Sequence, residues 1–593
     1  MIISLDIETS GLAINTDIHF VGLYMVNKNG KELFKMFTFP QDAERCRAFL
    51  ENLKEKGCHF VAHNGKFDSA RLKYNYGIDV RIDHDTMILG YLMSSVDELK
   101  DNRGKWLGLK AMAQRILGVE DWDIGKDKMS TDPEKVKPYL ILDCKYCYML
   151  YKWFAKRFPR SLEPTYRLVM NATQAYRDVE CNGLPIDMDG LHRLAEETTI
   201  KIEETKKVLA GFKDINWGSS RQLSQYLYEE LGLPIYSYTK SHQPSTGVEA
   251  LSELDGVHPV IKPLMELRRL EKVMSFCEQW EEAAIVHKDG HHYVHSNFNM
   301  HGTVTGRTSS SDVNLQQIPR NKALKSLFRS NDPEWEMVCM DYSQLELRFA
   351  GLVANVKAIK DSYRIGEDLH YKMASIVTGK DPKDITKEER TRAKAANFGF
   401  LYGMSAKSFV EYAHTSYGVR VTQEEADQIR YHFFELYPEL NDYYARVRED
   451  MLDDGCQTSI MGREYRVNPE KLLNQFVRED YLRAAINFPV QSAGSDYVIS
   501  GLIQVCRDPL LKDNVRIGAT VHDSIIALVR KDFRFFDYIN RMKEIMESPK
   551  IALDMIKVKP DFPIVVDVEI GPLGKGVSPD EYYPKWADET FPF

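Results

Sequence analysis

Hydrophobic and polar residues alternate at the start of the chain. In MIISLDIETSG the apolar residues take every second position, and Asp6 and Glu8 fall between them. Because successive side chains of a strand point to opposite faces, this pattern predicts a buried strand that carries both acids on one face. Two carboxylates held so close repel each other, which raises the pKa of at least one of them unless a cation lies between them. The first strand therefore predicts a cation-binding site.

The pattern of the remaining chain predicts two unlike parts. Before the two prolines of FPRSLEP (158–164), short apolar runs alternate with helical periodicity, and after them helical patterns dominate to about residue 282. A hairpin with a Lys-Asp-Gly turn (288–290) follows, then a strand ending at Asp341, a strongly helical middle and a last strand pair around His522. This order predicts a multidomain protein, with an N-terminal α/β domain joined to a larger α+β body.

The length and composition are typical of a globular protein of several domains. A chain of 593 residues is too long for one core, so about two to four domains are expected. No apolar run approaches the ~18 residues that cross a bilayer, so we expect no membrane partner. Nine cysteines, an odd number, argue against a disulfide framework and for reduced thiols in the cytoplasm. Cys144 and Cys147 are closely spaced, but a zinc site would need two more ligands.

The net charge of −9 does not exclude nucleic acid, because binding depends on where the positive charge lies. Residues 318–330 carry four basic residues and no acid, whereas the chain from Asp561 onward is acid-rich. The basic stretch fits either a contact with DNA or a solvated loop, and its composition leaves both open.

Three further side chains of the N-terminal region are candidates to join Asp6 and Glu8. Asp68 follows the apolar run HFVAHNG at the start of a helix, and Tyr139 and Asp143 are four residues apart, hence on one helix face. Together they could bind two Mg²⁺ ions, which prefer oxygen ligands, with Mn²⁺ as a substitute. Two ions ~4 Å apart stabilise the attacking and the leaving oxygen of a phosphodiester displacement. Tyr139 would orient the attacking water.

The segment TKEERTRAKAANFGFLYG (386–403) has a four-residue repeat. It opens on a capping box, Thr-x-x-Glu, so a helix should begin there. Arg390, Lys394, Phe398 and Tyr402 then form one stripe, basic at its N-terminal end and aromatic at the other. Cations and the positive helix end suit the phosphates of a nucleoside triphosphate, and the rings suit its base and sugar. An amphipathic helix with solvated basic residues is the alternative.

Two more apolar strands each present one aspartate. VCMDYSQLELRFAGL delivers Asp341 at the end of its strand, with Glu346 five residues later, and GATVHDSIIALV is interrupted by His522 and Asp523. Two such strands near a triphosphate-binding helix are what nucleotidyl transfer requires. One metal ion lowers the pKa of a primer 3′-hydroxyl, and the other neutralises charge on the pyrophosphate leaving group.

These motifs resemble those of a known family. The series DxE, NxxxD and YxxxD over about residues 1–155 resembles the proofreading 3′–5′ exonuclease domain of the DNA polymerase I family, in its tyrosine-bearing subtype. The segments around Asp341, 386–403 and Asp523, flanked by TGRTSSSDVNLQQIP and RAAINFPVQ, resemble the three polymerase motifs of family A DNA polymerases over about residues 280–593. The chain is similar to phage replicative members, and we expect no 5′-nuclease domain before Met1.

The resemblance implies a role for each matching residue. Two Mg²⁺ ions per site would be bound by Asp341 and Asp523 in the polymerase and by Asp6, Glu8, Asp68 and Asp143 in the exonuclease, with Tyr139 as a further catalytic group. The nucleotide site would comprise Gln344, Glu346, His370, Arg390, Lys394, Phe398 and Tyr402. Glu346 would exclude the ribose 2′-hydroxyl. The primer–template would be contacted by Arg307, Gln316, Arg483, Asn487, Gln491 and His522.

The same resemblance implies a fold and partners. It predicts a ribonuclease H-like exonuclease domain (1–160), a thumb with connecting helices (161–285), a palm in two parts (286–365 and 481–593) and fingers (366–480). In the thumb, Ser219 and Ser220 suit contact with phosphates. The partners would be primer–template DNA and deoxynucleoside triphosphates, with a replisome helicase or processivity factor as a further candidate. The chain is expected to be a monomer.

Two positions depart from the pattern of the family. Its last motif usually reads His-Asp-Glu, whereas this chain has Ser524 after Asp523. We expect the two aspartates to suffice, so that Ser524→Glu accelerates the enzyme less than about 100-fold, which corresponds to about 2.7 kcal/mol. The alternatives are a chain that is mainly a 3′–5′ exonuclease with a weakened polymerase domain, and a non-catalytic primer–template-binding factor. Phe398 replaces the tyrosine of some relatives, which implies strong discrimination against dideoxynucleotides.

Overall fold

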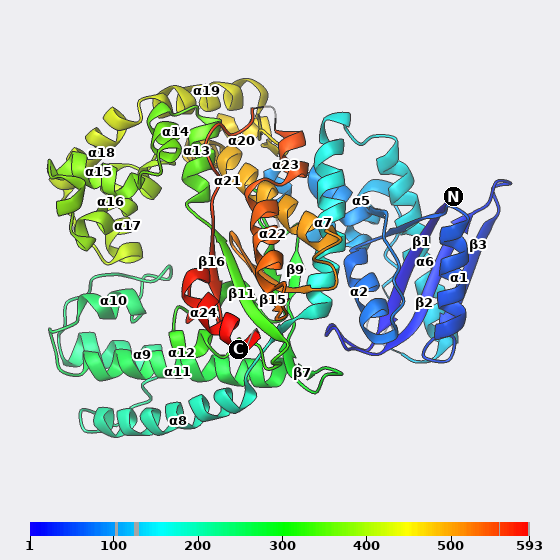
Figure 1. The fold of residues 1–593 in the computed structure, drawn as a ribbon, viewed down its shortest axis with the longest axis horizontal. Helices are drawn as coiled ribbons and strands as arrows, with labels where there is room; N and C mark the ends of the chain where they lie inside the picture. The colour runs from blue at the N-terminus through cyan, green and yellow to red at the C-terminus, as the bar shows by residue number, and fades with distance from the viewer. Residues whose placement is uncertain (101–104, 124–129, 557, 591–593) are drawn as a thin grey trace.

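Three groups of elements, namely an antiparallel sheet, a helical lobe and a pair of long helices, surround a central cleft (Figure 1). The N-terminal region lies beside them. The computed structural model describes the chain except residues 101–104, 124–129, 557 and 591–593. Its mixture of an α/β region and a larger α+β body confirms the fold class expected from the sequence. Within the described ranges, no helix has the length and apolar character needed to cross a membrane.

A five-stranded mixed sheet, of order β3–β2–β1–β4–β5, organises the N-terminal region. Its first strand, β1, pairs antiparallel with β2 and parallel with β4, and its apolar side chains pack on the side of α1. The other face, which carries Asp6 and Glu8, is covered by α6. Gly22 pairs with Asp6 on the neighbouring strand, and any side chain at Gly22 would collide with Leu140 of α6. The glycine therefore lets the helix approach the two acids.

The elements of this region are β1 (Ile2–Thr9), β2 (Ile18–Val26), β3 (Glu32–Thr38), α1 (Ala43–Glu55), β4 (His59–Ala62), α2 (Gly65–Tyr76), β5 (His84–Asp85), α3 (Thr86–Met93), α4 (Val96–Lys100), α5 (Leu109–Leu117) and α6 (Pro133–Ala155). The long helix α6 begins at Pro133, where the side chain of Asp132 accepts a hydrogen bond from Glu134 N. Its end at Ala155 falls just before the prolines that predicted a break.

Helix α7 (Glu163–Asn182) connects the two halves of the molecule. It packs against α2 on one side and against β14 and α21 on the other. Beyond it, the long helices α8 (Met188–Ala210) and α11 (Ile261–Ala283) run along each other at the lower left of Figure 1. Together with α9 (Ser220–Ser224) and α10 (Val248–Glu253) they form an apolar cluster of their own.

The second sheet is antiparallel throughout, in the order β14–β15–β11–β16. Its strands are β11 (Trp335–Tyr342), β14 (Val515–Val521), β15 (Ser524–Arg530) and β16 (Val566–Ile570). On β11, Asp341 pairs with Ser524 on one side and with Asp567 on the other. Helix α22 (Phe535–Glu547) packs on β15 and β16, and the face of the sheet that carries Asp341 opens into the cleft.

Around this sheet lie a helical lobe and several short elements. The helices of the lobe and of the sheet's surroundings are α12 (Lys322–Lys325), α13 (Leu345–Val353), α14 (Lys357–Arg364), α15 (Leu369–Thr378), α16 (Lys387–Phe400), α17 (Ala406–Tyr417), α18 (Gln423–Leu436), α19 (Glu439–Asp454), α20 (Pro469–Leu473), α21 (Gln475–Arg507), α23 (Lys550–Met555) and α24 (Pro579–Thr590). The short strands are β6 (Leu184–Pro185), β7 (Ala284–Val286), β8 (His292–Val294), β9 (Asn297–Asn299), β10 (Ser309–Ser311), β12 (Cys456–Thr458) and β13 (Glu464–Arg466). The hairpin predicted at residues 288–290 is confirmed, since β7 pairs with β8.

Candidate active sites

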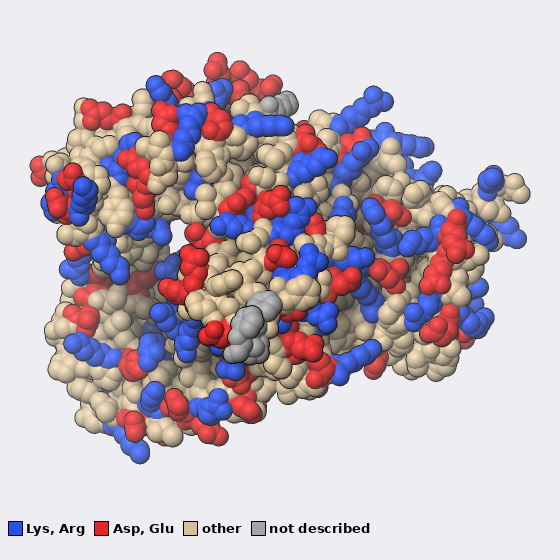
Figure 2. Space-filling view, viewed as in Figure 1, with Lys and Arg blue, Asp and Glu red and all other residues tan. Residues whose placement is uncertain are grey.

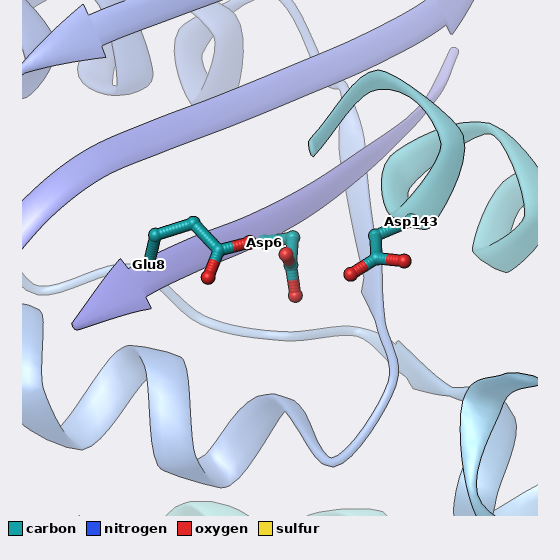
Figure 3. A group of neighbouring side chains, drawn as sticks. All are labelled: Asp6, Glu8 and Asp143. Carbon is teal, nitrogen blue, oxygen red and sulfur yellow. The ribbon is translucent and has the colours of Figure 1, made fainter. Parts of the chain in front are cut away.

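Three acids of the N-terminal region converge between β1 and α6. Asp6 and Glu8 extend from β1 and Asp143 from α6, and one carboxylate oxygen from each lies within 4.8 Å of the others (Figure 3). Asp68, at the start of α2, lies beside them, and its Oδ1 accepts a hydrogen bond from Ile7 N (3.0 Å). One oxygen of Asp68 therefore braces the strand that carries the cluster.

Electrostatics favours a cation in this cluster. Burial raises the pKa of Asp6 well above its ordinary value, and the nearby Asp68, Asp143 and Glu8 raise it further. Burial also raises the pKa of Asp68, to about 7, and that of Asp143. The four carboxylates offer hard oxygen ligands, which fit a divalent ion such as Mg²⁺ or Mn²⁺ and would be relieved of their repulsion by it.

The predicted tyrosine lies next to this cluster together with two residues that the sequence did not reveal. Burial and the neighbouring Asp143 raise the pKa of Tyr139 far above its ordinary value, so its phenol stays protonated. Lys110 Nζ lies 3.3 Å from Tyr139 Oη and forms an ion pair with Asp123 (2.8 Å). Trp122 Nε1 donates to Asp143 Oδ1 (2.5 Å). Lys110 thus brings a positive charge to the edge of the acidic cluster.

The second candidate site is a cleft of about 1000 Å³ against the antiparallel sheet. Figure 2 shows the hollow, with acidic and basic side chains around its rim. On the sheet side it is lined by Asp341, Asp523, Asp567 and Glu569, and on the facing side by Arg390 and Lys394 of α16. Acids on one wall and bases on the other suit a phosphorylated ligand that is bound together with metal ions.

The two aspartates predicted to be catalytic lie close together at the ends of their strands. Asp341 is near the end of β11, and Asp523 lies in the two-residue turn between β14 and β15. The other residue of this turn, His522, has a left-handed backbone conformation (φ 54°). Tyr342 N donates to Asp523 O (3.3 Å), which ties the turn to β11. Partial removal from water and the neighbouring Asp523, Asp567 and Glu569 raise the pKa of Asp341 to about 6. Burial also raises the pKa of Asp523.

Helix α16 presents the predicted stripe to the cleft. Thr386 and Glu389 form the capping box that was expected from the sequence. Arg390, Lys394 and Phe398 line the cleft, and Arg390 forms an ion pair with Asp368 (2.7 Å). One detail of the expectation is wrong, because α16 ends at Phe400 and Tyr402 lies beyond it. Gly403, at φ 75°, ends the helical geometry there and donates its N–H to Phe400 O.

Two side chains hold Glu346 in place, and one of them is Tyr402, although this residue lies beyond the end of α16. Arg307 Nη2 donates to one oxygen of Glu346, and Tyr402 Oη donates to the other (3.2 Å). Gln344, two residues before Glu346, has a left-handed backbone conformation (φ 52°). Its side-chain oxygen accepts a hydrogen bond from Tyr363 (3.0 Å). The carboxylate of Glu346, fixed in this way, lines the cleft.

His370 faces the same cleft as a neutral imidazole. Burial, reinforced by Arg390 and Lys394, lowers its pKa to about 4 although Asp368 acts in the opposite direction. Its Nδ1 lies 3.0 Å from the amide nitrogen of Asn397, which can only donate. The proton of the ring is therefore on Nε2, where it is available to a ligand.

Each of the two sites lies in a region that matches a known protein family. The family model for DNA polymerase family A matches residues 188–573, and a 3′–5′ exonuclease model matches residues 2–158. The chain belongs to DNA polymerase family A. This confirms the resemblance inferred from the motifs, and the exonuclease match covers the strand and helices that carry the N-terminal acids.

Relatives in this family include phage and bacterial proteins. The DNA polymerase of Bacillus phage SP01 is 27% identical over 88% of this chain and 64% of its own length. DNA polymerase I of Aquifex aeolicus is 28% identical over 89% of each chain, and the DNA polymerase of Escherichia phage T5 is 26% identical over 82% of this chain and 63% of its own. The chain thus spans less than two thirds of the length of these phage relatives.

A solved structure has the same fold. The POL domain of Pol1 from M. smegmatis, in complex with DNA primer-template and dNTP, superposes with a TM-score of 0.79 at 23% sequence identity. The match covers 96% of this chain and 95% of that one. The arrangement of elements in this chain is therefore that of the solved POL domain.

The residues predicted to contact DNA do not all lie together. Arg307 and His522 line the cleft with the two aspartates. Gln316 donates to Thr308 Oγ1 (3.0 Å) and to Thr520 O (3.4 Å) on β14. The remaining three, Arg483, Asn487 and Gln491, follow one face of α21 outside the set of residues that line the cleft. Arg483 is exposed and forms an ion pair with Asp480, whereas Asn487 Oδ1 is buried and accepts no hydrogen bond from the described residues.

Two acids and two bases of the cleft had not been assigned to it from the sequence. Asp567 and Glu569 of β16 flank Asp341, and their only sequence signal was the acid-rich C-terminal stretch. Arg320 and Lys325 of the basic stretch 318–330 also line the cleft, which favours the ligand-binding interpretation of that stretch over a solvated loop.

Proposed function

We propose that this chain is a template-directed DNA polymerase that extends a primer 3′ end and removes mispaired ends with a 3′–5′ exonuclease. The observation that carries the proposal is that one chain holds two separate carboxylate sites. One is enclosed between β1 and α6, and the other faces a basic helix across a cleft. The family A match and the exonuclease match support the same assignment.

In the polymerase site, Asp341 and Asp523 would hold two Mg²⁺ ions, with Mn²⁺ as a substitute. Ions held by these two aspartates would lower the pKa of the primer 3′-hydroxyl and neutralise charge on the pyrophosphate. Arg390 and Lys394 bind the triphosphate, because they face the acids across the cleft. Phe398 packs on the base and sugar of the nucleotide.

Three more residues adjust the position of the nucleotide in this proposal. His370 donates a hydrogen bond from its Nε2–H to a phosphate oxygen. Glu346, fixed by Arg307 and Tyr402, occupies the space beside the sugar and excludes a ribose 2′-hydroxyl. Gln344 completes this part of the nucleotide site from the turn before α13.

In the exonuclease site, Asp6, Glu8 and Asp143 would hold two Mg²⁺ ions, with Asp68 beside them. The protonated phenol of Tyr139 orients the attacking water by donating to it or to the phosphate. A frayed primer end would enter as a single strand, which leaves its phosphodiester free to meet the acids.

The partners follow from this activity. We propose primer–template DNA and deoxynucleoside triphosphates as substrates. The DNA would be contacted by Arg307, Gln316, Arg483, Asn487, Gln491 and His522. A palm (286–365 and 481–593), fingers (366–480) and thumb (161–285) would enclose it beside the exonuclease domain (1–160). We also propose a monomer in the cytoplasm, or the host cytoplasm if a phage encodes it, with a helicase or processivity factor as a further partner.

The test is extension of a labelled primer on a DNA template with Mg²⁺. Asp523→Ala should stop extension and still shorten the primer, whereas Asp6→Ala should extend the primer and no longer shorten it. If neither variant separates the two activities, the assignment of the two sites fails.

Ser524 favours one second candidate, an enzyme that is mainly a 3′–5′ exonuclease with a weakened polymerase site. Its position beside Asp341 carries no carboxylate. The same assay distinguishes the two, because that enzyme would only degrade the primer at saturating nucleotides.

A further inference from the structure

Strand β15 leaves one flank of Asp341 without a carboxylate. Ser524 is the partner of Asp341 in the ladder between β11 and β15. Its Oγ donates to Val521 O (2.8 Å) and so closes the turn that carries Asp523. The hydroxyl of Ser524 thus stabilises the turn between β14 and β15, and the side chain offers a metal ion no charged ligand.

The strand on the other flank supplies an acid at the same level. Asp567 of β16 pairs with Asp341, and opposed residues of an antiparallel pair have Cβ atoms about 5 Å apart on one face. Asp341, Ser524 and Asp567 therefore form a row across the sheet with Asp341 in the middle, and all three line the cleft.

The other acid of β16 lies further along the strand. Glu569 faces the same cleft, but it pairs with Cys339 and not with Asp341. Asp523 is tied through Tyr342 N to the C-terminal end of β11, where Asp341 also lies. Asp567 is thus the acid of β16 that lies level with the two aspartates, and Glu569, an acid of the same wall at another level, is the comparison for it.

We propose that Asp567 completes the polymerase metal site as its third carboxylate, from the opposite flank of Asp341 to Ser524. The inference rests on the proposed function, because the ions are those that nucleotidyl transfer uses. Independent support comes from Arg390 and Lys394, which face this row across the cleft and would place a triphosphate, with its ions, above it.

The geometry requires only a local adjustment. Among the residues that the structure describes, Asp341, Asp523 and Asp567 do not form a group with oxygens within 4.8 Å of one another. Rotation of the side chains closes such a gap, and Mg²⁺ keeps several waters through which a carboxylate can hold it. Asp567 therefore holds the ion or one of its waters once a nucleotide is in place.

The experiment compares Asp567→Asn with Glu569→Gln, both in an Asp6→Ala background so that the primer is not shortened. Mn²⁺ bound to the complex with a dideoxy-terminated primer–template and the next nucleotide is measured by electron paramagnetic resonance. We expect Asp567→Asn to weaken Mn²⁺ binding at least tenfold and Glu569→Gln, which also removes one negative charge from this wall, to weaken it less than about threefold. In primer extension, the Mg²⁺ concentration for half-maximal rate should rise by the same factors, and Asp567→Glu should restore it.

The outcomes separate this inference from the proposed function. If Asp341→Ala stops extension but Asp567→Asn binds Mn²⁺ like Glu569→Gln, the role of Asp567 is wrong and the polymerase site stands. If Asp341→Ala extends primers at the rate of its parent, the proposed site itself is wrong. Thermal unfolding of each variant, expected within about 2 °C of its parent, identifies a loss caused by misfolding.

Discussion

The acids of the N-terminal sheet and those of the antiparallel sheet differ in how far the fold assembles them. One carboxylate oxygen each of Asp6, Glu8 and Asp143 already lies within 4.8 Å of the others, with the pKa of Asp6 strongly raised and that of Asp143 raised as a result of burial. Asp341 and Asp523 line an open cleft and belong to no such group among the described residues. The first site is ready for a metal ion before any substrate arrives.

The difference follows from what holds each set of acids. In the N-terminal region a strand and a helix are packed together through Gly22 and Leu140, so the carboxylates have little freedom. In the cleft, the opposing wall is a helix in another lobe, and the ions would arrive with the triphosphate. We infer that the exonuclease site is preorganised and that the polymerase site is completed by its substrate.

The largest expected effect concerns the contact that joins the N-terminal region to the rest of the molecule. Lys66 of α2 is buried and pairs with the buried Glu180 of α7, and it also donates to Asn297 on β9 (2.8 Å). Lys66→Met leaves the carboxylate of Glu180 buried without its cation. We expect urea denaturation to show a loss of about 3–5 kcal/mol in the free energy of unfolding.

The matched control for Lys66 is a partly exposed ion pair between the same two helices. Lys73 of α2 forms an ion pair with Asp178 of α7 (2.8 Å), and both are about one third exposed. Lys73→Met should cost less than about 1 kcal/mol. Equal losses in the two variants would mean that the buried pair does not join the regions more strongly than a surface pair.

The next effect sharpens the contrast in preorganisation. The pKa of Asp68 is raised to about 7, and those of Asp6 and Asp143 are also raised. An acid whose pKa is raised in the folded state lowers the stability progressively as the pH rises from its unfolded pKa to the raised value, and a bound ion removes this penalty. Without DNA or nucleotide, the stabilisation by Mg²⁺ relative to EDTA should therefore grow by about 2–4 kcal/mol from pH 5 to pH 8.

Two variants show which site causes this dependence on pH. Asp6→Ala should abolish most of the stabilisation by Mg²⁺, and Asp523→Ala should retain it. A comparable loss in Asp523→Ala would show that the cleft also binds ions without substrate, and the contrast drawn above would be wrong.

A smaller effect concerns the cation at the edge of the exonuclease cluster. Lys110 contacts Tyr139 and offsets part of the negative charge on Asp6 and Asp143. Lys110→Ala should slow primer shortening about tenfold, or about 1.4 kcal/mol, and leave extension unchanged. Lys145→Ala is the control, since Lys145 lies on α6 but pairs with Glu32 (3.0 Å). Equal rates for the two variants would assign Lys110 no part in the reaction.

The smallest effect is expected at His370. Because its pKa is about 4, the ring is neutral between pH 6 and pH 8 and acts only as a donor. His370→Gln keeps a donor and should change the KM for nucleotide less than threefold, whereas His370→Ala should raise it more. Steady-state extension across that pH range should show the same profile for His370→Gln and the intact chain. Loss of an inflection in the variant would contradict the neutral state.

Periodicity was enough to predict the parts of each site that lie on one element. Asp6 and Glu8 follow from strand alternation, the start of α16 from its capping box, and the pairing of Tyr139 with Asp143 from helix spacing. Lys110 and Trp122 could not be found this way, because they reach the cluster from separate segments. Asp567 was missed for a similar reason: strand register over more than two hundred residues is fixed by tertiary packing, which no local pattern records.

Helix α7 has a practical consequence for anyone who wants a version of this protein without proofreading. Cutting the gene near residue 160 would leave α7 in place but remove α2, and with it the cation that neutralises Glu180. Such a truncated product would lose the ion pair of Glu180 and expose the apolar side chains of α7 that α3 covers, which favours aggregation and poor expression. A single replacement at Asp6 keeps the shared helix covered and is the safer way to separate the two activities.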